Sequence, residues 1–367
     1  MPIGGNRSEL TGATPMTIKV VQWATGAIGK TCLRAVIDHP DLELVGLYVH
    51  SAKKIGQDAG SIARRDLTGV IATGSIDEII ALEADVVLYT PLNPSDSLDE
   101  HDAIIKRLLA SGKNVITTIA HVYPQAFGEH YAKGFEDACR EGNSTLFGTG
   151  INPGFVAERL TVLLTGLCTR IDRIVTTEVY DVSEVQSAAF IFDLMGIGKP
   201  LEVIAEGSRV KRVFNHIFGE LVAYVGHALQ IEFDEVRADH EFGVANRDVT
   251  LPVGVVPQGG VVNFRWRWHG MKDSRPFFTI QMLWIADRQL PGWDLPDGWT
   301  VDITGAPGLH LKLDLVEPQG LPDRSKAMQY CVAAPVIRSI PDVVAAPPGV
   351  LLPPVFAAFS PRIGVRR

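Results

Sequence analysis

The sequence predicts an α/β fold: a Rossmann doubly wound parallel sheet, followed by a second α+β domain with a largely antiparallel sheet. Three observations support this prediction. A strand, a glycine turn and a helix follow one another near the start of the chain, as in the opening unit of a dinucleotide-binding domain. Short apolar strands then alternate with helical stretches, which is typical of a parallel sheet. The second half instead carries long runs of alternating polarity, which is typical of antiparallel strands with one buried face.

The opening unit has the chemistry of a phosphate site. Residues 18–21 form a short apolar strand, Gly26 and Gly29 lie in the turn, and residues 30–38 follow as a helix. Gly26 lets the backbone approach a pyrophosphate, Gly29 lets the helix pack against the strand, and the helix N-terminus favours a phosphate. The first glycine of the GxGxxG pattern is Ala24 here. A purely structural turn is the other interpretation, but the position between strand and helix favours nucleotide binding.

The second predicted strand bears on the choice of cofactor. It covers residues 42–50 and ends in His50 and Ser51, with Lys53 and Lys54 just beyond. An NAD-specific site usually carries an Asp or Glu there for the ribose 2′-hydroxyl, and this strand ends without one. A hydroxyl and two cations suit a 2′-phosphate better, so we expect NADP, with NAD as a second option. The alternative is that both lysines are ordinary solvated loop charges.

The first half of the chain continues to alternate. We expect strands at 69–72, 84–90, 114–118 and 145–148, and helices at 76–82, 99–111 and 135–141. Ligands of such sheets bind beyond the carboxyl ends of the strands, so one crevice should collect the loops that follow Trp23, His50, Thr90, Thr118 and Gly150. The expected cofactor contacts are Thr25, Gly26, Ala27, Ile28, Gly29, His50, Ser51, Lys53, Thr90, Pro91, Thr118, Ile119 and Asn152.

The second half predicts a different architecture. We expect strands at 171–180, 228–238, 261–268, 277–286 and 309–315, and helices at 188–195, 201–218 and 325–340. Trp266 and Trp268 alternate with Arg265 and Arg267. This pattern is either an aromatic and basic binding strip or the two faces of one strand, and we favour the two faces.

The length of 367 residues exceeds the usual limit of one hydrophobic core, so we expect two domains. The expected segments are a disordered leader at 1–16, the Rossmann domain at 17–154, a substrate and dimerisation domain at 155–322, a C-terminal helix and loop near the domain junction at 323–349, and a tail at 350–367.

The composition excludes several classes of protein. A net charge of -8 argues against a nucleic-acid or anionic membrane partner. The sequence has no transmembrane run and no apolar signal segment, so we expect a cytoplasmic protein. The histidines show no metal-ligand spacing, and the cysteines are scattered without a CxxC motif, at Cys32, Cys139, Cys168 and Cys331. We therefore expect neither a metal site nor disulfides.

Five motifs together resemble a known family. They are WATGAIG at 23–29, GINPGF at 150–155, EVYDVS at 178–183, FDLMGIG at 192–198 and AAPVIRSIP at 333–341. In this order they resemble the 2,4-diaminopentanoate dehydrogenases and native amine dehydrogenases, and the N-terminal domain is similar to that of dihydrodipicolinate reductase. The resemblance implies NAD(P) binding and a homodimer. It also implies reversible reductive amination, in which a ketone or aldehyde reacts with ammonia to give an amine.

One departure from the family concerns the loop after the strand at 114–118. The amine dehydrogenases carry a glutamate there, whereas this chain has Ala120 followed by His121. Hydride transfer does not depend on that residue, because it belongs to the nicotinamide. The proton donor would then be His121, Tyr123 or Tyr180, and we expect His121 and Tyr180 to be the catalytic residues. His101, in the preceding helix, is expected on the surface.

The junction between the domains supplies the remaining candidates. Asn152 lies in an Asn-Pro-Gly sequence, which fits either a contact to the cofactor carboxamide or substrate, or a simple turn. Glu178 and Asp181 flank Tyr180, and a pocket-facing carboxylate would bind an ammonium or iminium, whereas solvent-facing ones would be strand-edge charges. We expect a mostly hydrophobic substrate pocket formed by Ala120, Phe155, Glu178, Phe192 and Met195.

The resulting hypothesis is an NAD(P)H-dependent oxidoreductase, and specifically an amine dehydrogenase. A carbonyl or imine reductase that does not use ammonia is the first alternative, because the loop glutamate is missing. A non-catalytic NAD(P)-binding sensor is the second. The expected partners are a small carbonyl or amine substrate and ammonia.

Overall fold

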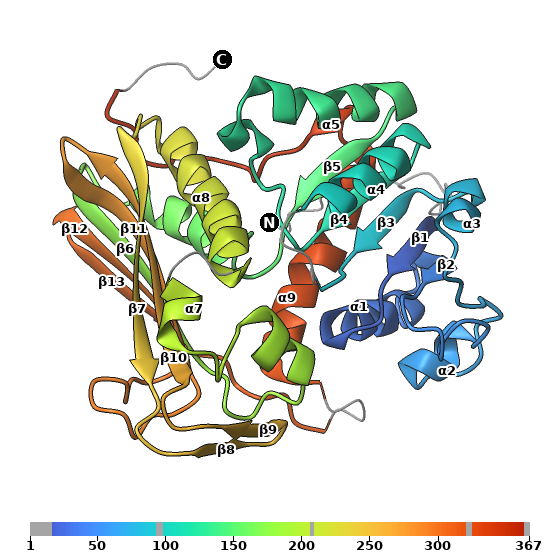
Figure 1. Ribbon diagram of the computed structural model, residues 1–367. Helices are drawn as coiled ribbons and strands as arrows, with labels where there is room; N and C mark the ends of the chain where they lie inside the picture. The colour runs from blue at the N-terminus through green and yellow to red at the C-terminus, as the bar shows by residue number, and fades with distance from the viewer. Residues whose placement is uncertain (1–16, 93–97, 206–208, 321–324, 363–367) are drawn as a thin grey trace, which may run out of the picture.

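The computed structural model describes residues 17–92, 98–205, 209–320 and 325–362, and Figure 1 shows its two domains. The leader expected at 1–16 lies outside the described residues. None of the helices described has the length and apolar character that crossing a membrane requires.

The first domain contains a six-stranded parallel sheet in the order β14-β5-β4-β3-β1-β2. Its strands are β1 (Ile18–Trp23), β2 (Leu42–Tyr48), β3 (Val86–Tyr89), β4 (Asn114–Thr117), β5 (Thr145–Gly148) and β14 (Gly349–Val350). The strand order reverses at β1, between β2 and β3, and this is where a doubly wound sheet binds its ligand. The doubly wound prediction is therefore confirmed.

Helices cover both faces of this sheet. On one face lie α3 (Ile76–Ala81), α4 (Asp99–Ala110) and α5 (Glu129–Gly142). On the other lie α1 (Ala27–Ile37), α9 (Ala327–Arg338) and α10 (Ile340–Ala345). The short helices α2 (Ala59–Ala63) and η1 (Pro124–Phe127) belong to connecting segments. Because both faces are covered, the central strand β3 is apolar and buried along its whole length.

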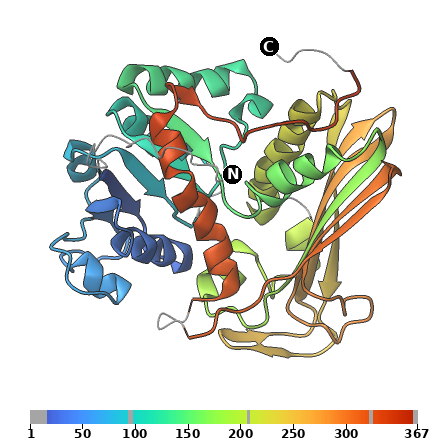
Figure 2. The same cartoon turned by 180° about the vertical axis from the view of Figure 1, so that it is seen from behind.

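The C-terminal segment contributes more to the first domain than the sequence suggested. Helix α9 lies beside α1 (Figure 2), and Val336 and Ile340 are fully buried against the sheet. Strand β14 then pairs in parallel with β5. The segment expected at 323–349 near the domain junction thus completes the Rossmann domain itself.

The second domain is built on a six-stranded sheet in the order β13-β12-β6-β11-β10-β7. Its strands are β6 (Arg170–Asp181), β7 (Glu235–Val244), β10 (Val261–Lys272), β11 (Arg275–Ile285), β12 (Gly298–Ala306) and β13 (Leu309–Leu313). All neighbours are antiparallel except β6 and β11. A largely antiparallel second sheet was predicted, and the structure confirms it.

Helix α8 (Arg209–Leu229) packs against the inner face of this sheet. Trp266 and Trp268 are buried on that face, whereas Arg265 and Arg267 lie on the outer face and pair with acidic residues of β7. The tryptophan and arginine alternation therefore marks the two faces of one strand. Neither view of the ribbon has a helix against the outer face among the described residues (Figures 1 and 2).

Several boundaries differ from the sequence prediction. The strand expected at 228–238 begins only at Glu235, because Ala228 and Leu229 are buried core residues of α8. Gln230 follows with a φ of +56°, a conformation that commonly ends a helix. The strand expected at 69–72 is reduced to isolated bridges at Ile71 and Thr73.

Other elements were not predicted. Strand β12 was missed although its buried Trp299, Val301 and Ile303 alternate with polar residues. Further unpredicted elements are β8 (Val249–Leu251), β9 (Gly254–Val256), the π-helical turn η2 (Val156–Thr161) with the short helix α6 (Val162–Thr165), and the elements α2, η1, α10 and β14 described above. The expected helix at 188–195 is a second π-helical turn, η3 (Ala189–Leu194), and the range expected as a helix at 201–218 contains α7 (Leu201–Ala205) and the beginning of α8.

Candidate active site

The turn between β1 and α1 has the shape that a dinucleotide requires. A Cβ added at Gly29 would lie 2.3 Å from the carbonyl oxygen of Ala24, so only glycine allows this close packing. Gly26 has no atom within 4 Å of such a Cβ, and no side chain caps the helix that starts at Ala27. Because the start of α1 is not capped by a side chain, its first backbone N–H groups can bind a phosphate. These residues fit an NAD(P) pyrophosphate.

Basic side chains gather beside this turn. Lys54 reaches back from the segment after β2, and its Nζ donates to the carbonyl oxygen of Thr25 at 3.1 Å and to its hydroxyl at 2.8 Å. The pKa of Lys30 is lowered by burial and by the nearby charges of Lys54, Arg34 and Arg64. His50, Ser51 and Lys53 are exposed in the same region.

The end of β3 is tied to β1 through side chains. The Thr90 hydroxyl donates to the carbonyl oxygen of Trp23 at 3.0 Å and accepts from the Gln22 amide at 2.9 Å. Pro91 follows and is buried. Thr90 thus stabilises the crevice wall, and direct cofactor contacts of Thr90 and Pro91 remain a prediction.

The loop after β4 encloses His121 rather than exposing it. The imidazole is 1% exposed, its Nε2 lies 2.7 Å from Asp102 Oδ1 in α4, and its ring packs on Phe135. Its Nδ1 is buried without a hydrogen-bond partner among the described residues. Ala120 beside it is also buried. Because the ring is enclosed inside the first domain, His121 is poorly placed to touch a substrate.

His101 is not the surface residue that the sequence suggested. It is buried, and its Nδ1 lies 2.7 Å from the hydroxyl of Tyr89 in β3. Burial lowers the pKa of His101 to about 4, so this ring is neutral at physiological pH. A helical position between charged neighbours had indicated exposure, but the face of α4 that carries His101 and Asp102 points into the protein.

Asn152 and Glu178 connect the two domains by a hydrogen bond. Asn152, in the loop after β5, donates its amide N–H to Glu178 Oε2 at 2.9 Å. The same carboxylate accepts indole N–H groups from Trp284 at Oε1 and from Trp299 at Oε2, both at 2.9 Å. Burial raises the pKa of Glu178, while these donors lower it. The Asn152 Oδ1 is buried without a donor among the described residues.

Tyr180 lies two residues beyond Glu178 on the same face of β6, because strand side chains alternate between faces. Its side chain is only partly buried, and burial raises the pKa of its hydroxyl, which therefore stays protonated. Asp181 points to the other face, where its carboxylate accepts from Arg288 at 3.2 Å. Asp181 is therefore a charge at the edge of the strand, and Glu178 is the carboxylate that points inward.

The apolar residues expected in the substrate pocket are not all lining residues. Met195 is 1% exposed and belongs to the core of the second domain. Phe192 lies against Gly254 at the turn between β8 and β9. Phe155 is 36% exposed, beside Arg159. These three side chains are therefore spread between core and surface.

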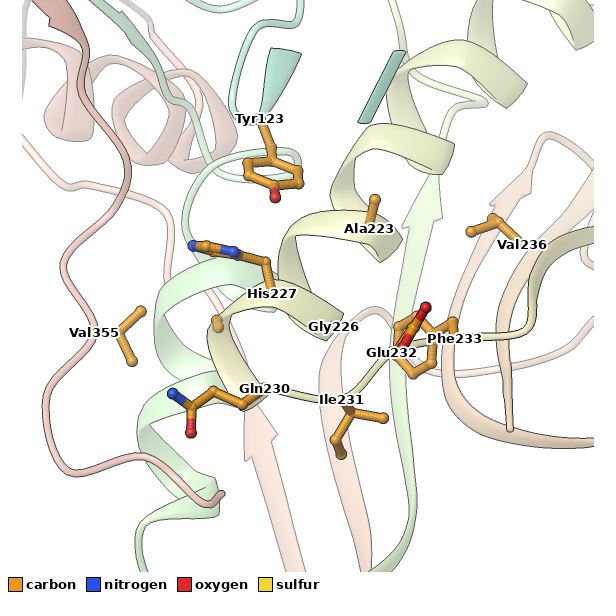
Figure 3. Close-up of a pocket in the computed structure, with 11 residues that line it drawn as sticks. Tyr123, Ala223, Gly226, His227, Gln230, Ile231, Glu232, Phe233, Val236 and Val355 are labelled. Carbon is orange, nitrogen blue, oxygen red and sulfur yellow. The ribbon is translucent and has the colours of Figure 1, made fainter. Parts of the chain in front are cut away.

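Tyr123 lies in a separate cavity of about 720 Å³ at the C-terminal end of α8. Figure 3 shows its ring above His227, on which it stacks with a centroid distance of 4.9 Å. Glu232 and Phe233 form another part of the cavity. Tyr123 thus contributes its ring to this cavity.

No cluster of side chains in the described residues has the composition of a metal site.

Two buried glutamates near these loops were not predicted. Glu220 of α8 accepts backbone N–H groups from the loop after β4, and Glu158 of η2 accepts the N–H of Gly154 at 2.8 Å. Burial raises the pKa of Glu158 to about 8. A glutamate in the middle of an apolar helical run is a sequence signal for such a buried carboxylate.

The parallel sheet, the glycine turn and the strand reversal define a dinucleotide-binding Rossmann protein with a second α+β domain. The chain belongs to the 2,4-diaminopentanoate dehydrogenase family, because the model of the 2,4-diaminopentanoate dehydrogenase C-terminal domain matches residues 155–354. The model of the dihydrodipicolinate reductase N-terminus matches residues 18–106. Both matches confirm the resemblance inferred from the motifs.

Two curated proteins are similar over nearly the whole chain. An amine dehydrogenase of Streptomyces virginiae is 28% identical, covering 90% of this chain and 94% of the relative. A 2,4-diaminopentanoate dehydrogenase of Acetoanaerobium sticklandii is 25% identical, covering 90% and 91%. The chain is therefore an NAD(P)-dependent oxidoreductase of the class that acts on C=O, C=N or CH–NH2 groups.

The solved structures agree on the fold. The structure of an amine dehydrogenase from Mycobacterium smegmatis has a TM-score of 0.70 with 19% identity, covering 93% of this chain and 98% of that one. A structure of GenD2 from gentamicin A biosynthesis in complex with NAD has a TM-score of 0.51 with 14% identity, covering 90% and 88%.

Proposed function

We propose that this protein is an amine dehydrogenase that catalyses reversible reductive amination of a small ketone or aldehyde with ammonia. The observation that carries the proposal is the pair formed by Asn152 and Glu178. A carboxylate that accepts the amide N–H fixes the orientation of the Asn152 side chain and leaves its Oδ1 as an acceptor. An acceptor next to a buried negative charge suits the N–H groups of an iminium or ammonium.

The residues have complementary roles in this proposal. Asn152 Oδ1 accepts an N–H of the imine nitrogen or of the cofactor carboxamide, and Glu178 stabilises positive charge nearby. Tyr180, with its protonated hydroxyl, supplies the proton on the same side of β6. The reduced nicotinamide, when bound, supplies the hydride. In this proposal His121 does not touch the substrate, because its imidazole is held by the hydrogen bond to Asp102.

NADP is the cofactor we propose, with NAD as a weaker ligand. Lys54 and Lys30 place positive charge beside the glycine turn, and Ser51 adds a hydroxyl at the end of β2. A 2′-phosphate would find charge complementarity there, whereas a ribose 2′-hydroxyl would lack the usual carboxylate partner.

We also propose that the protein is a homodimer. Its mass in solution, measured by light scattering, tests this.

The absence of a carboxylate at Ala120 favours one competing function, a carbonyl reductase that forms an alcohol without ammonia. The two functions differ in their product. The protein is incubated with NADPH, a panel of small carbonyls and ¹⁵N-labelled ammonium, and the products are analysed by mass spectrometry. Labelled amine supports the proposal, and alcohol as the sole reduced product contradicts it.

The role of Asn152 has its own test. Asn152→Ala removes the acceptor, and we expect the rate of amine formation to fall by about 10- to 100-fold, the range of a hydrogen bond to a charged group. Asn246→Ala, at an exposed position, is the control. Unchanged kinetics in Asn152→Ala would remove this residue from the site.

A further inference from the structure

We propose that Glu220 is a positioning residue of the cofactor site: from the second domain, it holds the loop after β4 in the conformation that NAD(P) binding requires. Neither the sequence motifs nor the family resemblance pointed to this residue. The loop, residues 118–123, belongs to the first domain and carries the predicted cofactor contacts Thr118 and Ile119.

The contact is a carboxylate held by two backbone donors. Glu220 Oε2 accepts the N–H of His121 at 3.0 Å, and Oε1 accepts the N–H of Tyr123 at 2.8 Å. The Glu220 side chain is 1% exposed. Its pKa is raised by burial and lowered by His121 and by the backbone N–H groups of the loop. Both oxygens are thus committed to the loop.

The loop depends on such a partner because its backbone is unfavourable. His121 has a φ of +69°, in the left-handed region that residues other than glycine rarely adopt. The backbone of His121 also lies so close to β5 that a Cβ added at Gly148 would be 2.4 Å from its carbonyl carbon. The Asp102 bond holds the His121 side chain, and Glu220 holds its main chain.

A glutamate meets the requirement and a glutamine does not. Two N–H donors directed at one side chain need two acceptor oxygens, and a carboxylate has them. Glutamine offers one oxygen and one NH2 group, so Glu220→Gln would place a donor against a backbone donor in a buried site. The isosteric change therefore releases one end of the loop without creating a cavity.

The consequence for the cofactor follows from the population of the loop. A protein whose binding-competent conformation is only fractionally populated binds with an affinity reduced by that fraction. Loss of one buried hydrogen bond changes such an equilibrium by roughly tenfold. We therefore expect Glu220→Gln to bind NADPH more weakly, by up to roughly tenfold, with the full factor reached when the competent conformation becomes the minor one.

A second carboxylate provides a matched control. Asp234 Oδ2 accepts the backbone N–H of Asp273 at 2.7 Å, in the turn between β10 and β11. Asp273 also has a positive φ, +50°, so the two contacts share their chemistry. Asp234→Asn removes the charge of this carboxylate and keeps one acceptor oxygen for the Asp273 N–H, in a turn outside the Rossmann domain.

The experiment uses the full-length protein and needs no substrate. NADPH binding is measured by the fluorescence of the nicotinamide, and backbone exposure by hydrogen–deuterium exchange, for the wild type, Glu220→Gln and Asp234→Asn. We expect weaker NADPH binding and faster exchange in peptides over 118–124 for Glu220→Gln alone. If that variant does not fold, Glu220→Asp, which keeps the charge but shortens its reach, is measured with the same expectation.

Two results would overturn the proposal. One is NADPH affinity within about twofold of the wild type despite faster exchange of the loop, which would limit Glu220 to stabilising the fold. The other is unchanged exchange in the loop, which would mean that Glu220 does not hold it. Neither result depends on whether the enzyme uses ammonia.

Discussion

At Ala24 the residue type does not match the backbone conformation. This residue replaces the first glycine of the dinucleotide-binding pattern, yet its φ is +74°, the conformation for which glycine is favoured. Its carbonyl oxygen is also the atom that Gly29 approaches most closely. The turn therefore keeps the geometry of the full motif at a cost in backbone strain.

Replacing Ala24 by glycine tests this interpretation. Ala24→Gly should raise the free energy of unfolding by about 1 kcal/mol, because it removes the left-handed strain of a residue with a Cβ. NADPH affinity should stay within about threefold. Urea denaturation measures the stability, and Ala110→Gly, in a helix with ordinary geometry, should instead lose stability. If Ala24→Gly instead lowers the free energy of unfolding, the Ala24 methyl group stabilises the protein by more than its backbone strain destabilises it.

Glu158 makes the protein sensitive to pH. In the folded protein, burial keeps this carboxyl protonated up to about pH 8, whereas the unfolded chain ionises near its ordinary pKa of 4.5. The folded state thus binds more protons than the unfolded state between these values. Stability must therefore fall as the pH rises through this window.

Glu158→Gln mimics the neutral carboxyl and can still accept the N–H of Gly154. The variant should exceed the wild type by at least about 1 kcal/mol of unfolding free energy at about pH 9, and the difference should become small at about pH 5. Thermal unfolding at both values measures it, with the exposed Glu129→Gln as control. A variant that is less stable than the wild type at the alkaline value would contradict a protonated Glu158.

At the scale of elements, the segment after β2 and the turn before α1 act as one unit. Lys54 joins them through its two hydrogen bonds to Thr25, and Lys30 of α1 adds a second cation. In the proposed site, Lys54 would take the place of the usual acidic residue at the adenosine end of the cofactor.

Lys54→Met should change the preference between cofactors. We expect NADPH affinity to fall by about tenfold, because a charged contact to the 2′-phosphate is lost, and NADH affinity to fall by less than about threefold. Fluorescence titration with each cofactor gives the ratio. Lys133→Met, which removes an exposed lysine paired with Asp137 on α5, is the matched control. If the affinities for NADPH and NADH fall equally, Lys54 stabilises the turn and does not contact the 2′-phosphate.

At the scale of the whole molecule, the alternation of strands and helices predicted the first domain well. Parallel strands buried on both faces give short apolar runs, and the glycines mark the first turn, so local patterns suffice. The role of residues 325–350 was not predictable in this way. The pairing of β14 with β5 joins segments about 200 residues apart, and no local pattern encodes that contact.

The candidate site was less predictable than the fold. The sequence indicated Asn152 and Glu178 separately, and their hydrogen bond depends on how the loop after β5 meets β6. His121 was chosen for its ring, but the orientation of that ring depends on Asp102 in helix α4. Glu220 lies about 100 positions from the loop that it contacts, just beyond the end of the helix predicted at 201–218. Side-chain partners across domains are set by tertiary packing rather than by local sequence.

We propose that this NAD(P)-dependent oxidoreductase forms amines from carbonyls and ammonia. The most direct measurement is the oxidation of NADPH, and separately of NADH, with small ketones and aldehydes at mildly alkaline pH, each with and without excess ammonium. We expect oxidation that requires ammonium and is faster with NADPH. Oxidation at the same rate without ammonium would contradict it and identify a carbonyl reductase.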